Sequence, residues 1–436
     1  MATRKRGRRI SGAAEISRRN DPAGRMPRPG SGSTSSGRLR IFSLLALILL
    51  ALLLLYFKAY GGRKYGTVSE DGSILSVYDR GLVKREITYR EVLAENSRTS
   101  ENTSVRHFLN PVLAYVTPWN SLGYELAEKF CFKLTHVSPV WYDLKSERNN
   151  FFLEGRHNSD SQWISRIKTN RNLVVLPRFV LEVLPSEMLK RKKQRDKVID
   201  IIVSECKEMG YDGVVLESWS RWAMHGVLHD VDMRRRALEF VKELATTLHS
   251  VNSSASPRGH LELVFVIPPP RSQHLKEHDF GRDDLRRLLD IVDGFSLMTY
   301  DFSGPHSPGP NAPLLWIRST LELLLGDDGG ARENAYKIFV GINFYGNDFL
   351  LTEGPGGEAI TGRDYLSLLR KHRPALQWEA ESSEHFFLYS HDKVRRAVFY
   401  PSLLSISLRL GEARSRGAAL SIWEIGQGLD YFFDLL

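Results

Sequence analysis

From about residue 108 to the C-terminus, short apolar runs alternate with longer charged segments, and this alternation restricts the fold more than any other feature. The segments 186–209 and 233–250 show helical spacing of apolar residues, and Gly210 is expected to end the first of these helices. The apolar runs predict strands at 112–117, 133–141, 172–176, 213–219, 261–267, 294–300, 337–344 and 418–423. Eight strands that alternate with helices predict an α/β fold of the (β/α)8 barrel type.

An open Rossmann-like sheet is the main alternative fold. Such a sheet should carry a Gly-x-Gly-x-x-Gly turn after an early strand, and the sequence has none. The segment between the seventh and eighth predicted strands is too long for one crossover helix. We therefore expect residues 106–436 to form a barrel with a small insertion between strands seven and eight.

The N-terminal region differs from this body in composition. Residues 1–40 are rich in Gly, Ser, Pro and Arg, and their eleven Lys and Arg residues against two acidic ones account for the whole net charge of +9. The remainder is electrically neutral, which argues against a nucleic-acid partner. Residues 1–40 have too few apolar residues to form a core, so we expect a disordered basic tail in the cytosol.

Residues 41–57 contain no charged residue and are mostly leucine. As a helix they would extend about 25 Å, just enough to cross a bilayer core. The basic flank predicts an uncleaved signal anchor, hence a single-pass type II membrane protein of the secretory system with a lumenal or extracellular barrel. A cleaved signal peptide, which would leave a secreted protein, and a buried core helix are the alternatives. Residues 58–105 are expected to be a polar connector.

Small motifs add few constraints on the chemistry. Asn102 and Asn252 begin N-glycosylation sequons, which fit a lumenal body. Cys131 and Cys206 are expected to be buried free thiols, with a disulfide between them as the alternative. The sequence shows no cofactor motif and no spacing typical of a metal site, so neither is predicted.

Residues 210–220 read Gly-Tyr-Asp-Gly-Val-Val-Leu-Glu-Ser-Trp-Ser. Alternate residues of a barrel strand point inward, which would give Val215, Glu217 and Trp219. The segment resembles the strand-four signature Asp-Gly-x-Asp-x-Asp-x-Glu of the glycoside hydrolase family 18 chitinases. The resemblance aligns Val215 and Glu217 with the two inward Asp residues, and Trp219 with the Glu that donates a proton. It implies a chitinase-like barrel whose acid catalyst is replaced by an indole.

Three further strand ends resemble the same family. Met298, Tyr300 and Asp301 match its Met-x-Tyr-Asp motif, Gly341–Gly346 is similar to Gly-x-Pro-x-Tyr-Gly, and the strand that ends at Trp423 resembles the one that supplies a Trp floor under the cleaved sugar. The combination resembles in particular a chitinase-like branch, the chitinase domain-containing proteins, in which the strand-four motif is altered.

Aromatic residues near the predicted strand ends point independently to a sugar ligand, because aromatic faces stack on the C–H groups of pyranose rings. Trp119, Trp141, Trp219, Trp222 and Trp423 all lie at or just past such ends. With the resemblance, which implies N-acetylglucosamine-type oligosaccharides as ligands, the candidate substrate-binding residues are Trp119, Trp141, Trp219, Tyr300, Asp301, Tyr345 and Trp423.

The resemblance implies substrate-assisted cleavage, in which a Glu protonates the leaving oxygen and the substrate acetamide attacks. An indole at position 219 offers no such proton, and loss of a general acid costs about 10²–10⁴-fold. We therefore expect oligosaccharide binding without standard chitinase activity. Glu217 is the candidate catalytic residue, expected to face a bound acetamide or to pair with Tyr300 or Arg178. The alternatives are a glycosidase with a displaced acid, either Glu217 or an insertion carboxylate such as Glu379, and a scaffold for an unknown protein partner.

Overall fold

The structure is a computed structural model that describes residues 74–436 except 149, 254–255, 257, 271–274, 327–332 and 352–353. The described residues fall within a compact unit that spans residues 65–436. The expected tail 1–40, the apolar segment 41–57 and the first part of the connector lie outside the described residues. Within the described part, no helix has both the length and the apolar character needed to cross a membrane.

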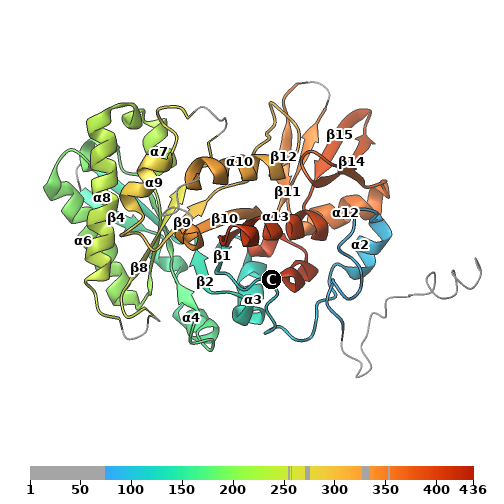
Figure 1. The fold of residues 1–436 in the computed structure, drawn as a ribbon, viewed down its shortest axis with the longest axis horizontal. Coiled ribbons are helices and arrows are strands. Elements are labelled where there is room, and N and C mark those ends of the chain that lie inside the picture. Colours follow the sequence, from blue (N-terminus) through green and yellow to red (C-terminus); the bar gives the residue numbers. More distant parts are fainter. Residues whose placement is uncertain are drawn as a thin grey trace, which may run out of the picture. The chain divides into compact units, whose positions relative to one another are not determined.

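A parallel sheet forms the centre of this unit (Figure 1). Its strands are β1 (Val112–Val116), β2 (His136–Pro139), β5 (Val174–Val175), β6 (Arg178–Leu181), β7 (Gly213–Glu217), β8 (Glu262–Ile267), β9 (Gly294–Leu297), β10 (Ile338–Asn343) and β16 (Ala419–Trp423). The order is β6-β7-β8-β9-β10-β16-β1-β2-β5. Beyond β6 the sheet continues with β3 (Tyr142–Glu147) and the antiparallel strand β4 (Asn150–Glu154). All eight predicted strand regions therefore contain or adjoin a strand of this sheet.

The sheet curls. This follows from β5 and β6, which are far apart in the strand order although they are neighbours in the chain. β5 pairs with β2 and β6 pairs with β7, and only Leu176 and Pro177 separate the two strands. The Leu176 amide donates to the Val137 carbonyl at 2.9 Å, and the Pro177 carbonyl accepts from the Val215 amide at 3.0 Å. This is an α/β barrel fold with a curled sheet, and the complete closed ring of eight strands stays a prediction.

Helices cover the outside of the curled sheet. They are α3 (Ser121–Lys129), α4 (Ser161–Ile167), α5 (Pro185–Met188), α6 (Lys192–Met209), α7 (Trp219–Met224), α8 (Val231–His249), α9 (Arg282–Leu288), α10 (Leu314–Leu325) and α13 (Leu403–Ser415). The predicted helix 233–250 is confirmed apart from its ends, whereas the predicted helix 186–209 is divided into α5 and α6, with residues 189–191 between them. Gly210 ends α6 with φ of 68°, a left-handed conformation that glycine adopts without the strain of a Cβ.

Alternation along the strands separates the apolar residues into two layers. Inward residues form an interior cluster, and outward residues pack against the helices in a larger one. The interior cluster consists of Leu113, Tyr115, Val174, Leu176, Val215, Val264, Val266, Phe339 and Ala419. Whether a strand residue points inward therefore follows from the cluster to which it belongs. The same criterion shows which tryptophans can reach the barrel interior.

The predicted insertion between the last two barrel strands is confirmed and is larger than a hairpin. It contains β11 (Gly346–Leu350), β12 (Gly357–Ile360), β13 (Gln377–Glu379), β14 (Glu384–His391) and β15 (Val394–Phe399), with helix α12 (Gly362–His372). The strands form a second sheet in the order β12-β11-β15-β14-β13. Local pairing of neighbouring segments explains why this part forms its own antiparallel sheet rather than extending the parallel one.

Residues 74–105 pack against the rest of the unit instead of forming a free polar connector. Helix α2 (Tyr89–Glu95) lies in this segment, and Arg80 pairs with both Glu95 and Asp434, the latter at 3.5 Å. The side chains of Arg80 and Asp434 are almost fully buried. The segment therefore belongs to the same compact unit as the C-terminal residues.

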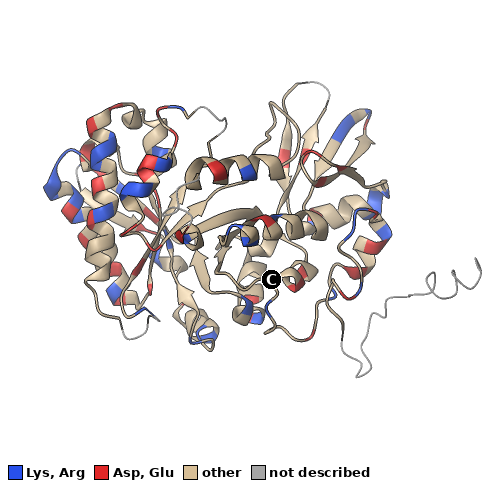
Figure 2. Cartoon of the chain, viewed as in Figure 1, with Lys and Arg blue, Asp and Glu red and all other residues tan. Residues whose placement is uncertain are grey.

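Basic and acidic residues are interspersed along the helices around the sheet (Figure 2). Lys192 pairs with Asp196 within α6 at 2.7 Å, and Arg195 reaches from α6 to Glu243 on α8 at 2.8 Å. This mixture agrees with the neutral composition of the chain after residue 40. In the interior, Cys131 and Cys206 are both buried and free, which confirms that prediction.

Candidate functional site

Two aromatic and two charged residues meet inside the barrel. Tyr115, Glu217 and Trp423 lie at or next to the C-terminal ends of β1, β7 and β16, and Arg178 is the first residue of β6. Nε of Arg178 donates a hydrogen bond to Oε2 of Glu217 at 2.6 Å, and Nη2 of Arg178 completes the ion pair. The guanidinium of Arg178 lies 5.3 Å from the ring centre of Trp423, which is 5.1 Å from the ring of Tyr115. We call Tyr115, Arg178, Glu217 and Trp423 the barrel-mouth cluster.

Of the partners expected for Glu217, the structure selects Arg178. The strand register explains the choice, since Arg178 on β6 is opposite Val215 on β7, two residues before Glu217 and on the same inward face. Both charged side chains keep some exposure, 15% for Arg178 and 17% for Glu217. In this arrangement the Glu217 carboxyl group serves as a hydrogen-bond acceptor for Arg178.

Tyr300, Asp301 and Tyr345 form a second group of residues near the barrel-mouth cluster. Tyr345 donates a hydrogen bond from its hydroxyl to Oδ1 of Asp301, and its ring is 6.3 Å from that of Tyr300. Asp301 has a left-handed backbone with φ of 59°, which is uncommon for a residue other than glycine. Its amide donates to Oδ1 of Asn311 at 2.8 Å. The structure therefore brings Tyr300 and Asp301 of the Met-x-Tyr-Asp motif together with Tyr345 of the segment Gly341–Gly346.

Burial controls the protonation of the phenols in this site. It raises the pKa of Tyr300 well above the usual value, and the nearby Tyr115, Glu217 and Asp301 add to the shift. Tyr300 thus stays protonated, and within the described residues its hydroxyl has no hydrogen-bond partner. By contrast, Tyr115 donates to Oγ of Ser296 at 2.8 Å. Tyr300 is therefore a hydrogen-bond donor that remains available to a ligand.

A buried ion pair that the sequence did not predict binds the loop that contacts Asp301. Oε1 of Glu384 on β14 lies 3.1 Å from Nη2 of Arg409 on α13. The Glu384 carboxylate also accepts from the amides of Asn311 at 3.0 Å and Ala312 at 2.7 Å. Burial raises the pKa of Glu384 and lowers that of Arg409. The insertion and α13 thereby hold the loop that orients Asp301, and no local sequence signal joins these distant residues.

Trp219 does not lie in the barrel interior, so the prediction that it points into the cleft is wrong. Its side chain is fully buried, donates from Nε1 to the His278 carbonyl at 3.0 Å, and packs edge-on against Phe280 with ring centres 4.9 Å apart. The reason is local: β7 ends at Glu217, and Ser218 with φ of −150° and ψ of −29° turns the chain into α7. Alternation stops there, and the indole turns into the outer layer.

Trp141 is also misplaced by the sequence prediction. It is 3% exposed, donates from Nε1 to the Tyr124 hydroxyl at 2.7 Å and packs against Trp163 in the outer layer. Val140 packs against the interior cluster, so the next residue faces the helices. Trp222 is fully buried outside the barrel as well. Of the remaining candidates, Trp423 lies in the cluster, and Trp119, which follows β1, is 69% exposed.

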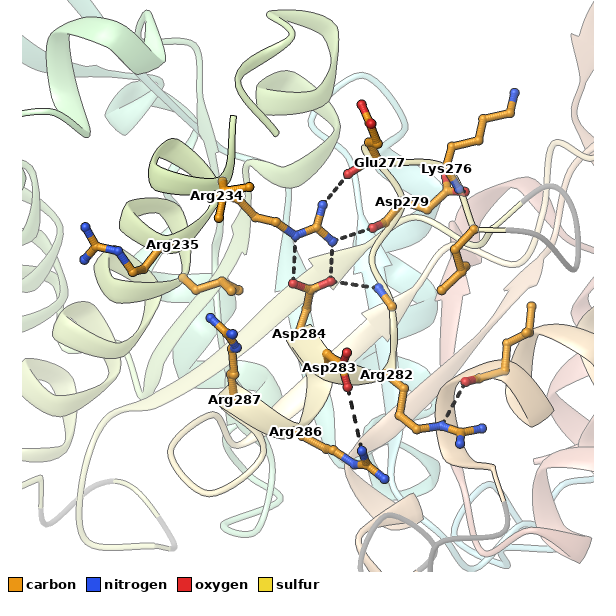
Figure 3. A pocket seen from close by; sticks show the side chains of 15 residues that line it. Arg234, Arg235, Lys276, Glu277, Asp279, Arg282, Asp283, Asp284, Arg286 and Arg287 are labelled. Atoms are coloured by element: carbon orange, nitrogen blue, oxygen red, sulfur yellow. Dashed lines mark hydrogen bonds and ion pairs between the residues drawn. The ribbon is translucent and has the colours of Figure 1, made fainter. Parts of the chain in front are cut away.

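A surface hollow of about 790 Å³ lies between α8, α9 and the loop before α9 (Figure 3). Figure 3 shows Arg234 forked onto Asp284, with Nε donating to Oδ1 at 3.0 Å. Nη2 of the same guanidinium donates to the Asp279 carbonyl at 2.8 Å, and the group lies 5.1 Å from the ring centre of Trp219. None of the predicted sugar-binding residues lines this hollow. Trp219 therefore contributes to the support beneath the hollow rather than to the barrel-mouth cluster.

The two sequon residues are accessible in the described part of the chain. Asn102 and Asn252 are both exposed, and Oδ1 of Asn102 accepts from Oγ of Ser104 at 2.7 Å. Exposure is necessary for attachment of a glycan, and glycosylation at these positions stays a prediction.

Comparison with known proteins agrees with the barrel. The model of the family described as Glycosyl hydrolases family 18 matches residues 112–428. An uncharacterized glycosylase of Bacillus subtilis (strain 168), YvbX, is 20% identical over 255 residues, which cover 57% of this chain and 67% of that protein. The crystal structure of a chitinase from Chromobacterium violaceum has 18% identity and a TM-score of 0.61, covering 75% of this chain and 98% of the other. A chitinase from Cycas revoluta in complex with (GlcNAc)3 has 14% identity and a TM-score of 0.59, covering 74% and 97%.

Proposed function

The chain belongs to family 18 of the glycosyl hydrolases, and from this membership we propose that it binds N-acetylglucosamine-type oligosaccharides without standard chitinase turnover. The observation that carries the proposal is the Arg178–Glu217 ion pair beside Trp423. It provides a stacking surface and hydrogen-bonding groups at the barrel mouth, where barrel enzymes bind their substrates. Its only carboxylate is already neutralised by a guanidinium.

The ligand class follows from the groups that remain available. Trp423 offers an aromatic face, the Tyr300 hydroxyl offers a donor, and Asp301 offers carboxylate oxygens for hydroxyl or amide groups of a sugar. A combination of aromatic side chains and a few polar groups is typical of small-ligand sites. The (GlcNAc)3 complex of the similar Cycas revoluta chitinase supports the choice of an N-acetylated oligosaccharide.

The arrangement of carboxyl groups argues against efficient cleavage. The residue aligned with the family acid, Trp219, is buried outside the barrel. Glu217 accepts hydrogen bonds from Arg178, and Asp301 accepts one from Tyr345. Both carboxyl groups are thus engaged as hydrogen-bond acceptors rather than placed as proton donors, and general acid catalysis typically supplies about 10²–10⁴-fold.

A glycosidase with a displaced acid is the second candidate, because Glu217 is partly exposed at the barrel mouth. Loss of the Arg178 hydrogen bonds on ligand binding would free this carboxyl group for proton transfer. The insertion carboxylate Glu379 is less suited, since it lies on β13 and accepts a hydrogen bond from Ser382. Assignment to the chitinase domain-containing branch is likewise part of the proposal.

Replacing Trp423 with alanine should weaken binding of chitotetraose by about 2 kcal/mol, roughly 30-fold in Kd, because the main stacking surface is lost. Isothermal titration calorimetry of the full-length protein measures the change. Trp378→Ala is the matched control: Trp378 is also half-buried, but its ring packs on His385 4.7 Å away. Equal loss in both variants, or no binding by the wild type, would refute the sugar site and favour a protein scaffold.

The same samples decide between binding and cleavage. Wild-type protein incubated with chitotetraose should release no shorter sugars at a rate comparable to a working chitinase. If it does release them and Glu217→Gln abolishes the release, Glu217 is a displaced acid. This isosteric change keeps the side-chain volume while removing the acid, so its effect on turnover is separable from misfolding by the melting temperature.

For localisation, we propose a lumenal or extracellular barrel behind an anchor at residues 41–57. In cells that secrete glycoproteins, the protein should carry N-glycans at Asn102 and Asn252, and each Asn→Gln change should remove one endoglycosidase-sensitive shift on gels. In sealed microsomes the barrel should resist protease. Cleavage of the barrel in intact vesicles together with the absence of any glycan would reverse the orientation.

A further inference from the structure

Two histidines and an aspartate meet at the end of the barrel opposite the barrel-mouth cluster. His249 is the last residue of α8, His260 precedes β8 by two positions, and Asp293 directly precedes β9. His260 and Asp293 lie at the N-terminal ends of strands, away from the sugar site, and the end of α8 brings His249 to them. We propose that His249, His260 and Asp293 form a zinc-binding site.

The spacing of the side chains suits a small metal ion. One ligand atom from each residue can be chosen so that all three lie within 4.8 Å of one another, and Nε2 of His249 is 2.9 Å from Oδ2 of Asp293. Two ligands that each bind zinc at about 2.0–2.1 Å lie roughly 3 Å apart. The His249–Asp293 pair already has this separation, and a rotation of the His260 ring, whose centre is 4.3 Å from that of His249, would bring in the third ligand.

Surrounding hydrogen bonds orient the ligands as metal sites require. Nδ1 of His260 is 3.1 Å from the Leu261 carbonyl oxygen, and the Leu263 amide donates to Oδ2 of Asp293 at 2.8 Å. Metal-bound histidines commonly bond their other nitrogen to a carbonyl, and ligating carboxylates accept such amide bonds. Within the described residues, each of the two rings keeps one nitrogen without a hydrogen-bond partner.

Asp293 is only 9% exposed, so the carboxyl group that it offers to a metal ion is largely shielded from water. Two imidazoles and one carboxylate form a nitrogen and oxygen ligand set that suits zinc, with water as the fourth ligand.

Arg258 competes with a metal ion for the carboxylate. Its Nη1 lies 3.0 Å from Oδ1 of Asp293, and its Nε lies 3.2 Å from Oε1 of Glu262. Lys337 is a further cation near Asp293, but its Nζ donates to the carbonyls of Leu289 and Val292. The Arg258 side chain is 42% exposed and can turn to solvent when the metal enters. Arg258 should therefore tune the affinity of the site.

A bound ion would join three segments of the barrel base: the end of α8, the turn before β8 and the start of β9. Groups at this end of a barrel contribute to stability rather than to chemistry. Metal binding should accordingly raise the melting temperature of the protein without changing its affinity for chitotetraose. The zinc site and the sugar site are therefore independent, and either can be absent while the other is present.

The test uses full-length protein freed of metal with a chelator and titrated with ZnCl2 by calorimetry and thermal melting. One zinc should bind and raise Tm, and His260→Ala should weaken binding by at least about 10-fold. His225→Ala is the control, because His225 is exposed and lies outside the cluster. Arg258→Ala should bind zinc more tightly, which a purely structural role of the three ligands would not produce.

Cobalt substitution gives a second readout that does not depend on stability. Co²⁺ at the site should show visible d–d absorption that disappears in the His249→Ala/His260→Ala variant, while melting without metal verifies that the variant is folded. The inference is overturned if the wild type binds no zinc, if the double variant retains the site at unchanged affinity, or if His225→Ala loses it equally.

Discussion

Trp219→Glu should destabilise the protein by about 3–5 kcal/mol and should not create a chitinase. The expected loss is that of a large buried aromatic side chain, increased by the burial of a carboxyl group among apolar neighbours. Trp219 is fully buried between Trp222, Phe265 and Phe280, so the new carboxyl group would face the outer layer and not a sugar. Restoring the family acid by this one change is therefore not possible on the present backbone.

Trp119→Glu is the matched control for this change. Trp119 is 69% exposed, and substitutions at such positions usually alter stability by no more than about 0.5 kcal/mol. Urea unfolding of the two variants beside the wild type measures the difference, and release from an aryl chitobioside measures activity. A Trp219→Glu variant that keeps wild-type stability or gains hydrolysis would show that position 219 faces the barrel interior after all.

Arg409→Met should also cost about 3–5 kcal/mol, because it leaves the buried Glu384 carboxylate without its cation. Arg409 as a whole residue is 2% exposed. Its guanidinium also donates to the carbonyls of Ser405 at 2.7 Å and Ser383 at 3.0 Å. Those carbonyls would lose a buried partner as well. Since Glu384 binds the Asn311 amide, the variant should in addition weaken chitotetraose binding through a loosened Asp301.

Arg414→Met on the same helix provides the comparison. Arg414 is exposed, donates to the His107 carbonyl at 3.1 Å and lies 5.7 Å from the ring centre of Phe108, so its replacement should change stability much less than that of the buried Arg409. Arg409→Met combined with Glu384→Leu should be milder than Arg409→Met alone, because both charges are then absent. If Arg409→Met and Arg414→Met unfold at the same urea concentration, the ion pair does not hold the loop.

Much of the fold was accessible from local pattern. The strands β1, β7, β8, β10 and β16 lie within the predicted ranges because their apolar periodicity is long and unbroken. The prediction was weaker around residues 133–181, because the predicted strands 133–141 and 172–176 contain only β2 and β5, and the strands β3 and β6 that follow them were not predicted. There Pro177 interrupts one strand, since it lacks an amide hydrogen for the ladder.

The candidate site was predictable where a residue lies inside a strand or in an intact motif. Trp423 is inward on β16, and Glu217 is inward on β7 with Arg178 as one of its expected partners. Trp141 and Trp219 were misassigned because each lies at a strand end, where one residue of difference reverses the direction of a side chain. The position of a residue near a strand end therefore predicted the correct end of the barrel. It did not predict whether the side chain points into the barrel or toward the outer helices.

By itself, the sequence determined the alternation of strands and helices, the family motifs and the absence of the usual acid residue at position 219, because these are properties of neighbouring residues. Only the tertiary structure decided that Trp219 leaves the barrel, that Arg409 and Glu384 support Asp301, and that His249 and His260 meet Asp293. Such contacts depend on how far each strand extends and where its neighbours end. Those are outcomes of packing the whole chain, and no local stretch of residues encodes them.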